Sequence, residues 1–533
     1  DGSLPKCVME LNIAKFSIPS LDEVPIKFAD LYPVQLFIRF SLKILSIEFI
    51  FDFEKCSINC NKISLKNMKI IKILSLIYIS ILVLSCANNQ TKNKSFEKPN
   101  VILIMADDIG FEALQINGAD DYKTPVLDSL ARNGINFTNA YSQPLCTPTR
   151  VKIMTGKPNY INYEYFTYLN PNQKTFGNLF QENGYKTSLV GKWQLNGVQY
   201  DLENNQDLNR PYHFGFDEYC LWWLRERGDR FANPNIVQNG KKLETNIDDY
   251  GADIFSDFIV DFIEKNKNDP FFIYYPMALV HDPFRPTPDS KDWDDLDKRN
   301  SGNDPKYFSD MVTYMDKVVG TITDAIRKNN LDKNTILIFL GDNGTDKKVV
   351  TLNNGKEIKG SKGVTIKYGS NVPMILNWNN YINEPRTSDV LIDFTDFYAT
   401  FEDILNVDKP DSYGKSLIPL MLNEGYKERD ILITYYNPMW GSSGLTRGVY
   451  AQDKNYKLYK SGKFFKYSED LFEENPISFN VFSEEENKIY NSLKKSLDSV
   501  PALPAQNHNG WKERGTEVKQ SNKFNSIWQL NSE

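Results

Sequence analysis

The sequence predicts an α/β protein with a large, mostly parallel sheet flanked by helices and a small C-terminal antiparallel sheet. Between residues 99 and 428, short apolar runs typical of strands buried on both faces alternate with amphipathic segments of helical spacing. From residue 429 onward, short aromatic-rich runs are separated by turn residues, which favours a small antiparallel subdomain followed by a polar tail to residue 533. Apolar residues make up 41% of the chain and charged residues 25%, as in ordinary globular proteins.

The individual elements follow from local patterns. Thr124 and Pro125 have the residue types of an N-cap and a first helical position, and Gly134 ends that helix. Phe258 and Phe262 are two of the apolar residues that recur at helical spacing in a later segment. Strands are expected over 101–105, 187–190, 271–275, 335–340 and 372–376, helices over 125–133, 176–183, 252–265, 307–327 and 394–405, and C-terminal strands over 431–435, 446–450, 456–459 and 464–467.

The N-terminal region has the pattern of an export signal. A short basic segment beginning at Met68 precedes an apolar run over 73–84, so residues 68–85 are expected to be a signal peptide. Val-Leu-Ser before Cys86 resembles a bacterial lipobox, which makes Cys86 the expected lipidation site; a plain signal with an incidental cysteine is the alternative. Residues 1–67 are then an upstream extension outside the mature protein, and 86–98 form a tether. We therefore expect an exported bacterial protein, periplasmic or lipid-anchored in the outer membrane.

Composition excludes several classes of function. The net charge of −7 argues against a nucleic-acid partner. Only 3 histidines are present, with no HExxH motif, and no nucleotide-phosphate loop is found. After Cys86 only Cys146 and Cys220 remain, so if Cys146 takes part in chemistry, Cys220 has no intramolecular partner.

Acidic residues follow two of the predicted strands. Asp107 and Asp108 come after the first strand, and Asp342 and Asn343 follow the strand over 335–340. Asp and Asn also form turns, but ligands of open α/β sheets bind at the carboxyl ends of strands, where both pairs would meet. An all-oxygen site of this kind suits Ca²⁺ or Mg²⁺ better than zinc.

The most specific motif is Pro-Leu-Cys-Thr-Pro-Thr-Arg over residues 144–150, followed by Met-Thr-Gly-Lys over 154–157. Pro148 fits the first turn of a helix, which leaves Cys146 near the helix N-terminus, where free N–H groups favour an anion. A buried cysteine beside a proline-containing turn would account for Cys146 but not for the rest of the motif.

With these motifs the chain resembles the formylglycine-dependent sulfatases of the alkaline phosphatase superfamily, over most of residues 99–480. Further matching motifs are the run ending at Asp108, Gly-Lys-Trp at 191–193, Gly-Phe-Asp at 215–217, His-Asp-Pro at 281–283, Asp-Asn-Gly at 342–344, Gly-Ser-Lys at 360–362 and Val-Pro at 372–373. The resemblance implies a sulfuric ester hydrolase with its catalytic domain over 99–428.

The resemblance also implies a role for each matching residue. Cys146 would be converted by a formylglycine-generating maturation enzyme to 3-oxoalanine, whose hydrate attacks the sulfur and forms a covalent sulfo-enzyme. Arg150 would orient the diol. One Ca²⁺ would be held by Asp107, Asp108, Asp342, Asn343 and the side chain derived from Cys146. Lys192, His281 and Lys362 would neutralise the sulfate, and His281 or Lys362 would protonate the leaving alkoxide.

Two positions depart from the family pattern. The residue two after Lys192 is Gln194 where the family has a histidine, and glutamine can contact the diol or substrate but cannot accept its proton. Residues 367–371 replace the usual acidic-Gly-Gly-x-Arg pattern, which affects the expected substrate contacts more than the metal site.

The implied substrate is a sulfated polysaccharide of algal type or its oligosaccharides. Trp222 and Trp223 would offer flat faces to sugar rings, with Arg225, Arg227 and Arg230 binding further anionic groups; a short amphipathic helix with buried tryptophan is the alternative. Arg285, four residues after His281, is the other expected glycan contact. Two other functions stay open: a formylglycine-dependent phosphodiester or phosphonate hydrolase, and a non-catalytic glycan-binding lipoprotein on the same scaffold.

Overall fold

The computed structural model describes residues 98–196, 207–222, 224, 228–407, 412–439 and 445–504. The predicted extension, the signal peptide, the lipidation site Cys86 and most of the tether lie outside these residues. Within the part of the chain that is described, no helix is both long and apolar enough to cross a membrane.

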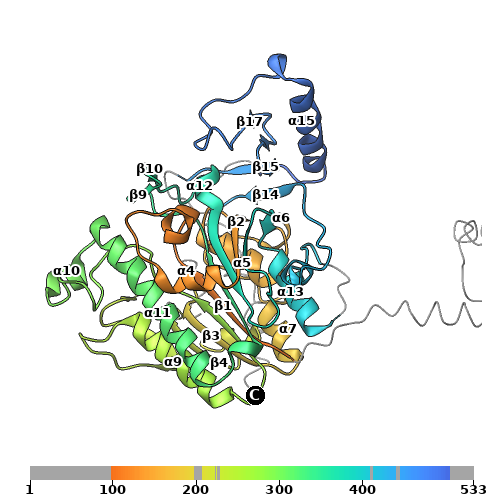
Figure 1. Cartoon of the computed structure of the whole chain (residues 1–533). Helices are drawn as coiled ribbons and strands as arrows, with labels where there is room; N and C mark the ends of the chain where they lie inside the picture. Colours follow the sequence, from red (N-terminus) through yellow and green to blue (C-terminus); the bar gives the residue numbers. More distant parts are fainter. Residues whose placement is uncertain are drawn as a thin grey trace, which may run out of the picture. The chain divides into compact units, whose positions relative to one another are not determined.

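A mixed sheet of eleven strands forms the centre of the protein (Figure 1). The strand order is β12-β2-β11-β8-β1-β7-β3-β4-β5-β6, with β13 also paired to β2. Strands β8, β1, β7, β3 and β4 run parallel, as the buried apolar runs predict. The strands are β1 (Asn100–Ala106), β2 (Ile135–Tyr141), β3 (Lys186–Lys192), β4 (Glu218–Trp222), β5 (Ile236–Gln238), β6 (Lys241–Lys242), β7 (Phe271–Pro276), β8 (Thr335–Gly341), β11 (Asn371–Asn377), β12 (Arg386–Ser388) and β13 (Ile392–Asp393).

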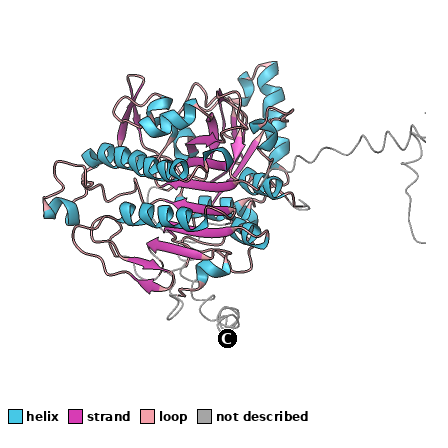
Figure 2. Cartoon of the chain, turned by 60° about the horizontal axis from the view of Figure 1, so that its bottom comes forward, coloured by secondary structure: helices cyan, strands magenta, loops and turns pink. Residues whose placement is uncertain are grey.

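Helices cover both faces of this sheet (Figure 2). Successive side chains of β1 point to opposite faces, so Ile102 packs in one core cluster with Ile259 of α9, and Leu103 packs in the other with Val151 of α5. The first face carries α4 (Pro125–Arg132), α9 (Gly251–Asn266) and α11 (Phe308–Lys328), and the second carries α5 (Cys146–Thr155), α7 (Phe176–Glu182) and α13 (Asp396–Leu405). Short helices complete the layers: α6 (Asn159–Asn162), α8 (Arg210–His213), α10 (Leu296–Ser301), α12 (Lys367–Ser370) and α14 (Ile418–Met421).

The predicted C-terminal antiparallel sheet is present, in the order β14-β15-β16-β17. Leu493 and Leu497 of α15 pack against Val449 and Leu458 of this sheet, which gives it a core of its own. A separate hairpin of β9 and β10 follows β8. These elements are β9 (Val350–Asn353), β10 (Lys356–Lys359), β14 (Leu432–Tyr436), β15 (Gly448–Gln452), β16 (Lys457–Tyr459), β17 (Phe464–Phe465) and α15 (Glu484–Leu497).

Three local expectations are corrected. Strand β11 runs antiparallel to both β8 and β2, because no long helix crosses the sheet between β8 and β11. The segment ending at Trp222 is strand β4 and not a short helix. Thr124 precedes α4 as expected, but its hydroxyl donates to Asp128 and accepts from the Gln115 N–H, so it does not cap an N–H group of α4.

Candidate active site

The acidic residues predicted after the strands lie together at one edge of the sheet. Ala106 and Gly341 are paired in register at the ends of β1 and β8, so the residues that follow them enter the same space. The Asp108 N–H donates to Asp342 Oδ1 at 3.0 Å, and Asn343 Nδ2 donates to Asp108 Oδ1 at 2.9 Å. The structure therefore brings the predicted oxygen donors together in a fully buried cluster.

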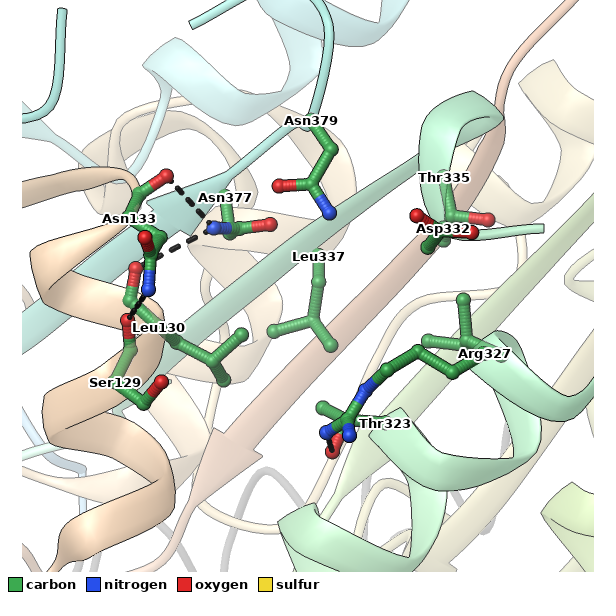
Figure 3. A pocket seen from close by; sticks show the side chains of 11 residues that line it. Ser129, Leu130, Asn133, Thr323, Arg327, Asp332, Thr335, Leu337, Asn377 and Asn379 are labelled. Atoms are coloured by element: carbon green, nitrogen blue, oxygen red, sulfur yellow. Dashed lines mark hydrogen bonds between the residues drawn. The ribbon is translucent and has the colours of Figure 1, made fainter. Parts of the chain in front are cut away.

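The opposite edge of the sheet holds a cavity of about 370 Å³ without comparable chemistry (Figure 3). It opens beside Thr335, the first residue of β8, and beside Asn377 at the end of antiparallel β11. Asn377 Nδ2 donates to the Asn133 and Leu130 carbonyls, which satisfies carbonyl groups at the end of α4. The reactive groups thus lie at the carboxyl edge, as in other open α/β sheets.

The acidic cluster fits a hard divalent cation. Asp107 Oδ1 and Asn343 Oδ1 are buried and accept no hydrogen bond from any described residue. Burial, with the charge of Asp107, raises the pKa of Asp342, so Asp342 resists ionisation without added positive charge. Carboxylate and amide oxygens that accept no hydrogen bond are ligands that Ca²⁺ or Mg²⁺ would satisfy.

Three cations surround these carboxylates. Lys192 Nζ lies 2.5 Å from Asp107 Oδ2, and Lys362 Nζ lies 2.5 Å from Asp108 Oδ2. Arg150 Nη2 lies 3.0 Å from Asp342 Oδ2, while its Nη1 donates to the Lys192 carbonyl at 2.7 Å. Burial alone would lower the pKa of Arg150, but the neighbouring carboxylates outweigh it and raise the pKa, so this guanidinium stays charged.

Cys146 is the first residue of α5, as its motif predicts. The preceding residue Leu145 makes no side-chain cap, so the N–H groups of the first turn stay available near the cysteine. The Cys146 side chain is almost completely buried, and burial raises the pKa of its thiol. An unmodified thiol here is therefore a poor nucleophile, because the thiolate is the reactive form.

His281 lies beside the acidic cluster, whereas the family resemblance predicts that it contacts the sulfate. Its Nε2 is 3.6 Å from Asp108 Oδ2, and Asp107, Asp108 and His281 together form a group able to hold a metal ion. His281 Nδ1 lies 2.6 Å from the Asp282 carbonyl oxygen and 2.9 Å from Asp282 Oδ1. Burial lowers the pKa of His281, which favours a neutral ring that donates from Nδ1 and accepts at Nε2 from Lys362, 3.0 Å away.

Gln194 faces the cysteine at the position where the family resemblance predicts histidine. The Cys146 thiol donates to Gln194 Oε1 across 3.7 Å. Gln194 has a positive φ of 52°, a conformation rare outside glycine and asparagine, so the backbone is held in a strained form at this point. The contact confirms that residue 194 adjoins Cys146.

Sequence patterns did not indicate two aromatic neighbours of Cys146. Tyr436 of β14 and Phe166 pack in one cluster with Cys146 and Leu145. The Tyr436 hydroxyl is buried and has no hydrogen-bond partner among the described residues. Because Tyr436 lies in the C-terminal sheet, far from the cysteine motif in sequence, no local pattern could have linked the two.

These residues match a known family. A family model described as Sulfatase matches residues 99–407, which contain both acidic pairs and the Cys146 motif. The chain belongs to the sulfatase family. It is a sulfuric ester hydrolase.

Similar curated proteins are sulfatases of several substrate types. An arylsulfatase of Hemicentrotus pulcherrimus is 26% identical over 447 residues, covering 77% of this chain and 78% of that protein. The N-acetylgalactosamine-6-sulfatase of Mus musculus is 26% identical over 387 residues, covering 64% of this chain and 69% of that protein.

Solved structures support the same fold. Ps i-CgsB in complex with k-i-k-neocarrahexaose is 23% identical with a TM-score of 0.63, covering 81% of this chain and 100% of that one. A protein in complex with its substrate D-glucosamine-2-N,6-O-disulfate is 22% identical with a TM-score of 0.62, covering 76% of this chain and 99% of that one.

The residues predicted to contact a glycan have different outcomes in the structure. Trp222 is almost completely buried in the core, so the expectation that it presents a flat face to sugars is wrong. Trp223 lies outside the described residues. Arg285 forms an ion pair with Asp229 and donates to the Gly302 carbonyl at 3.0 Å, and its contact with a glycan stays a prediction.

Proposed function

We propose that this sulfatase cleaves sulfate esters of glycans with a nucleophile derived from Cys146 and with one Ca²⁺ held by Asp107, Asp108, Asp342 and Asn343. The observation that carries the proposal is the placement of Cys146 at the start of α5 with a thiol that burial keeps protonated. Conversion of Cys146 to 3-oxoalanine would supply, on hydration, a hydroxyl nucleophile at that place. Bound Ca²⁺ would supply Lewis acidity towards that hydroxyl and the sulfate.

The cations beside the cluster have separate tasks in this proposal. Lys192 and Lys362 are each within 2.5 Å of a carboxylate oxygen, so they can turn towards sulfate oxygens when a cation takes over neutralising the carboxylates. Arg150 is held at both ends of its fork by Asp342 and the Lys192 carbonyl, which suits a fixed role in orienting the nucleophile.

Lys362 and His281 supply the proton for the leaving group. Burial alone would lower the pKa of Lys362, but Asp108 and other neighbouring charges outweigh it, so the ammonium carries the proton. Neutral His281, with Nε2 3.0 Å from that ammonium, accepts a hydrogen bond from it and positions it. Both side chains are partly exposed, whereas the carboxylates behind them are not, so the leaving alkoxide is expected on this side.

Three observations support a glycan substrate, export and modification. Relatives include sulfatases named for N-acetylgalactosamine, and one similar structure contains a carrageenan-type oligosaccharide. The basic and apolar pattern before Cys86 supports export with a lipid anchor to the periplasmic side or outer membrane of a bacterium. The motif over 144–150 supports recognition by a formylglycine-generating enzyme.

Mass spectrometry of the peptide ending at Arg150 tests the nucleophile directly. In protein produced together with a formylglycine-generating enzyme, this peptide should show the mass change expected when the Cys146 thiol is replaced by an aldehyde, and the protein should gain sulfate-releasing activity. Cys146→Ala is the control, and it should release no sulfate under the same conditions. A homogeneous thiol in fully active protein would overturn the proposal.

A further inference from the structure

Arg230 is a charged side chain near the active site that has no hydrogen-bond or ion-pair partner among the described residues. Its guanidinium makes no hydrogen bond and no ion pair with any residue that the structure describes, and Nη1 is buried from solvent. Arginine has five N–H donors, and buried donors in native proteins nearly always find an acceptor. An unsatisfied guanidinium at this place therefore indicates a missing ligand.

The backbone and the side chain of Arg230 are both held in place. Asp229 Oδ1 accepts from the Phe231 N–H at 2.8 Å, and the Phe231 carbonyl accepts from the Gly251 N–H at 2.7 Å. The guanidinium carbon of Arg230 lies 4.2 Å from the centre of the Trp222 ring, within the range of a cation–π contact. This contact holds the guanidinium against the Trp222 ring.

Two contacts place Arg230 next to the sulfate-binding cations. Trp222, on which it stacks, is paired in register with Lys192 on the neighbouring strand. Asp229 pairs with Arg285, which follows His281 by four residues. Burial lowers the pKa of Arg230, and the carboxylates of Asp107, Asp282 and Asp108 act in the opposite direction, as expected for a group near the acidic cluster.

We propose that Arg230 binds a second anionic group of the substrate, a sulfate or a carboxylate on the sugar whose ester is cleaved or on its neighbour. This rests on the proposed function as a glycan sulfatase. Arg150, Lys192, Lys362 and Arg285 each pair with a carboxylate, whereas Arg230 pairs with none in the part of the chain that the structure describes. The guanidinium fork matches two oxygens of a sulfate or carboxylate. A substrate with only one sulfate has no second anionic group for Arg230 and therefore leaves this desolvated cation without a ligand.

Binding to the unconverted full-length chain tests this without any need for turnover. The ligands are N-acetylgalactosamine with one sulfate ester, with two sulfate esters, and with one sulfate ester and a linked uronic acid, each measured by calorimetry with Ca²⁺ present. Wild type should bind at least one of the two dianionic ligands about tenfold more tightly than the monosulfate, as expected for one charge-assisted contact. The preferred ligand identifies the second anion as sulfate or carboxylate.

In Arg230→Gln, the dissociation constant of the monosulfate divided by that of the preferred dianionic ligand should fall close to one. Arg230→Lys keeps a positive charge over Trp222 but lacks the guanidinium fork, so it should retain part of the preference for the dianionic ligand. This second variant keeps the test informative if Arg230→Gln unfolds. Arg327→Gln is the matched control, because Arg327 pairs with Asp324 beside the cavity at the opposite edge of the sheet (Figure 3). This variant should show the same ratio of dissociation constants as wild type.

Two negative outcomes have different meanings. An equal ratio in wild type and in every folded Arg230 variant would show that Arg230 does not contact a second anion, while the proposed function stands. Absence of binding by all three ligands to wild type would instead contradict the glycan substrate itself.

Discussion

Glu112 provides a quantitative test of the buried network behind the active site. Its side chain lies after β1, with Oε1 accepting from the Thr345 hydroxyl at 2.6 Å and Oε2 buried without a partner among the described residues. Burial raises the pKa of Glu112 from 4.5 to about 7. The folded protein therefore binds this proton more tightly than the unfolded chain does.

The sign of the effect on stability follows from that pKa. The contribution of Glu112 is fully present below pH 4.5 and is lost as the pH rises through 7. Each unit of pKa difference corresponds to about 1.4 kcal/mol, so between pH 5 and pH 8 the free energy of unfolding should fall by about 2 to 3 kcal/mol through Glu112 alone. Asp316, whose pKa burial raises to about 6, acts in the same direction and is left unchanged by the substitution.

Glu112→Gln removes this titration and keeps an acceptor for Thr345. Urea unfolding at a series of pH values gives the free energy of unfolding at each pH. Between pH 5 and pH 8 this free energy should fall by about 2 to 3 kcal/mol less in the variant than in wild type. Glu264→Gln, at an exposed position of α9, should follow the wild-type curve. Parallel curves for Glu112→Gln and wild type would show that Glu112 is ionised in the folded protein and would contradict its raised pKa.

Three further substitutions test the active site. Asp342→Asn should lower sulfate release at least a hundredfold and weaken Ca²⁺ binding measured by calorimetry, because one buried ligand charge is lost. Full activity of wild type after exhaustive chelation would contradict the metal site. Gln194→His should raise sulfate release, or leave it unchanged, in steady-state assays, because histidine can accept a proton beside Cys146; a large loss would show that glutamine is adapted to this site. Tyr436→Phe should leave the melting temperature equal or higher, since the buried hydroxyl has no hydrogen-bond partner among the described residues, and should lower kcat about tenfold; an unchanged kcat would show that Tyr436 only packs against Cys146.

Sequence reasoning succeeded where a function depends on short stretches of chain. The run of apolar residues 101–105 is β1 almost to the residue, and the amphipathic segment over 307–327 is α11. Residues at the ends of parallel strands must meet at one edge, so the joint placement of Asp107 and Asp342 followed from the fold class.

It failed where neighbours come from distant segments. Trp222 looks like an exposed aromatic residue in a charged segment, yet pairing of β4 with β3 and β5 buries it in the core. The ion pair of Arg285 with Asp229 could likewise not be read from the sequence, whereas the predicted contact of Arg285 with a glycan stays a prediction. Such pairings depend on loop paths that local patterns do not encode.

The sequence by itself determined the α/β class, the order of most elements and the oxygen and cysteine groups of the active site, because strand periodicity and motif spacing act over a few residues. The surroundings of those groups appear only in the folded chain: Tyr436 from the C-terminal sheet packs against Cys146, His281 lies against Asp108, and Arg230 lies over Trp222 without an ion-pair partner among the described residues. The physical reason is that burial, pairing and charge balance are properties of side chains that approach from separate elements, and their positions are set only when the sheet and its covering helices close around one core.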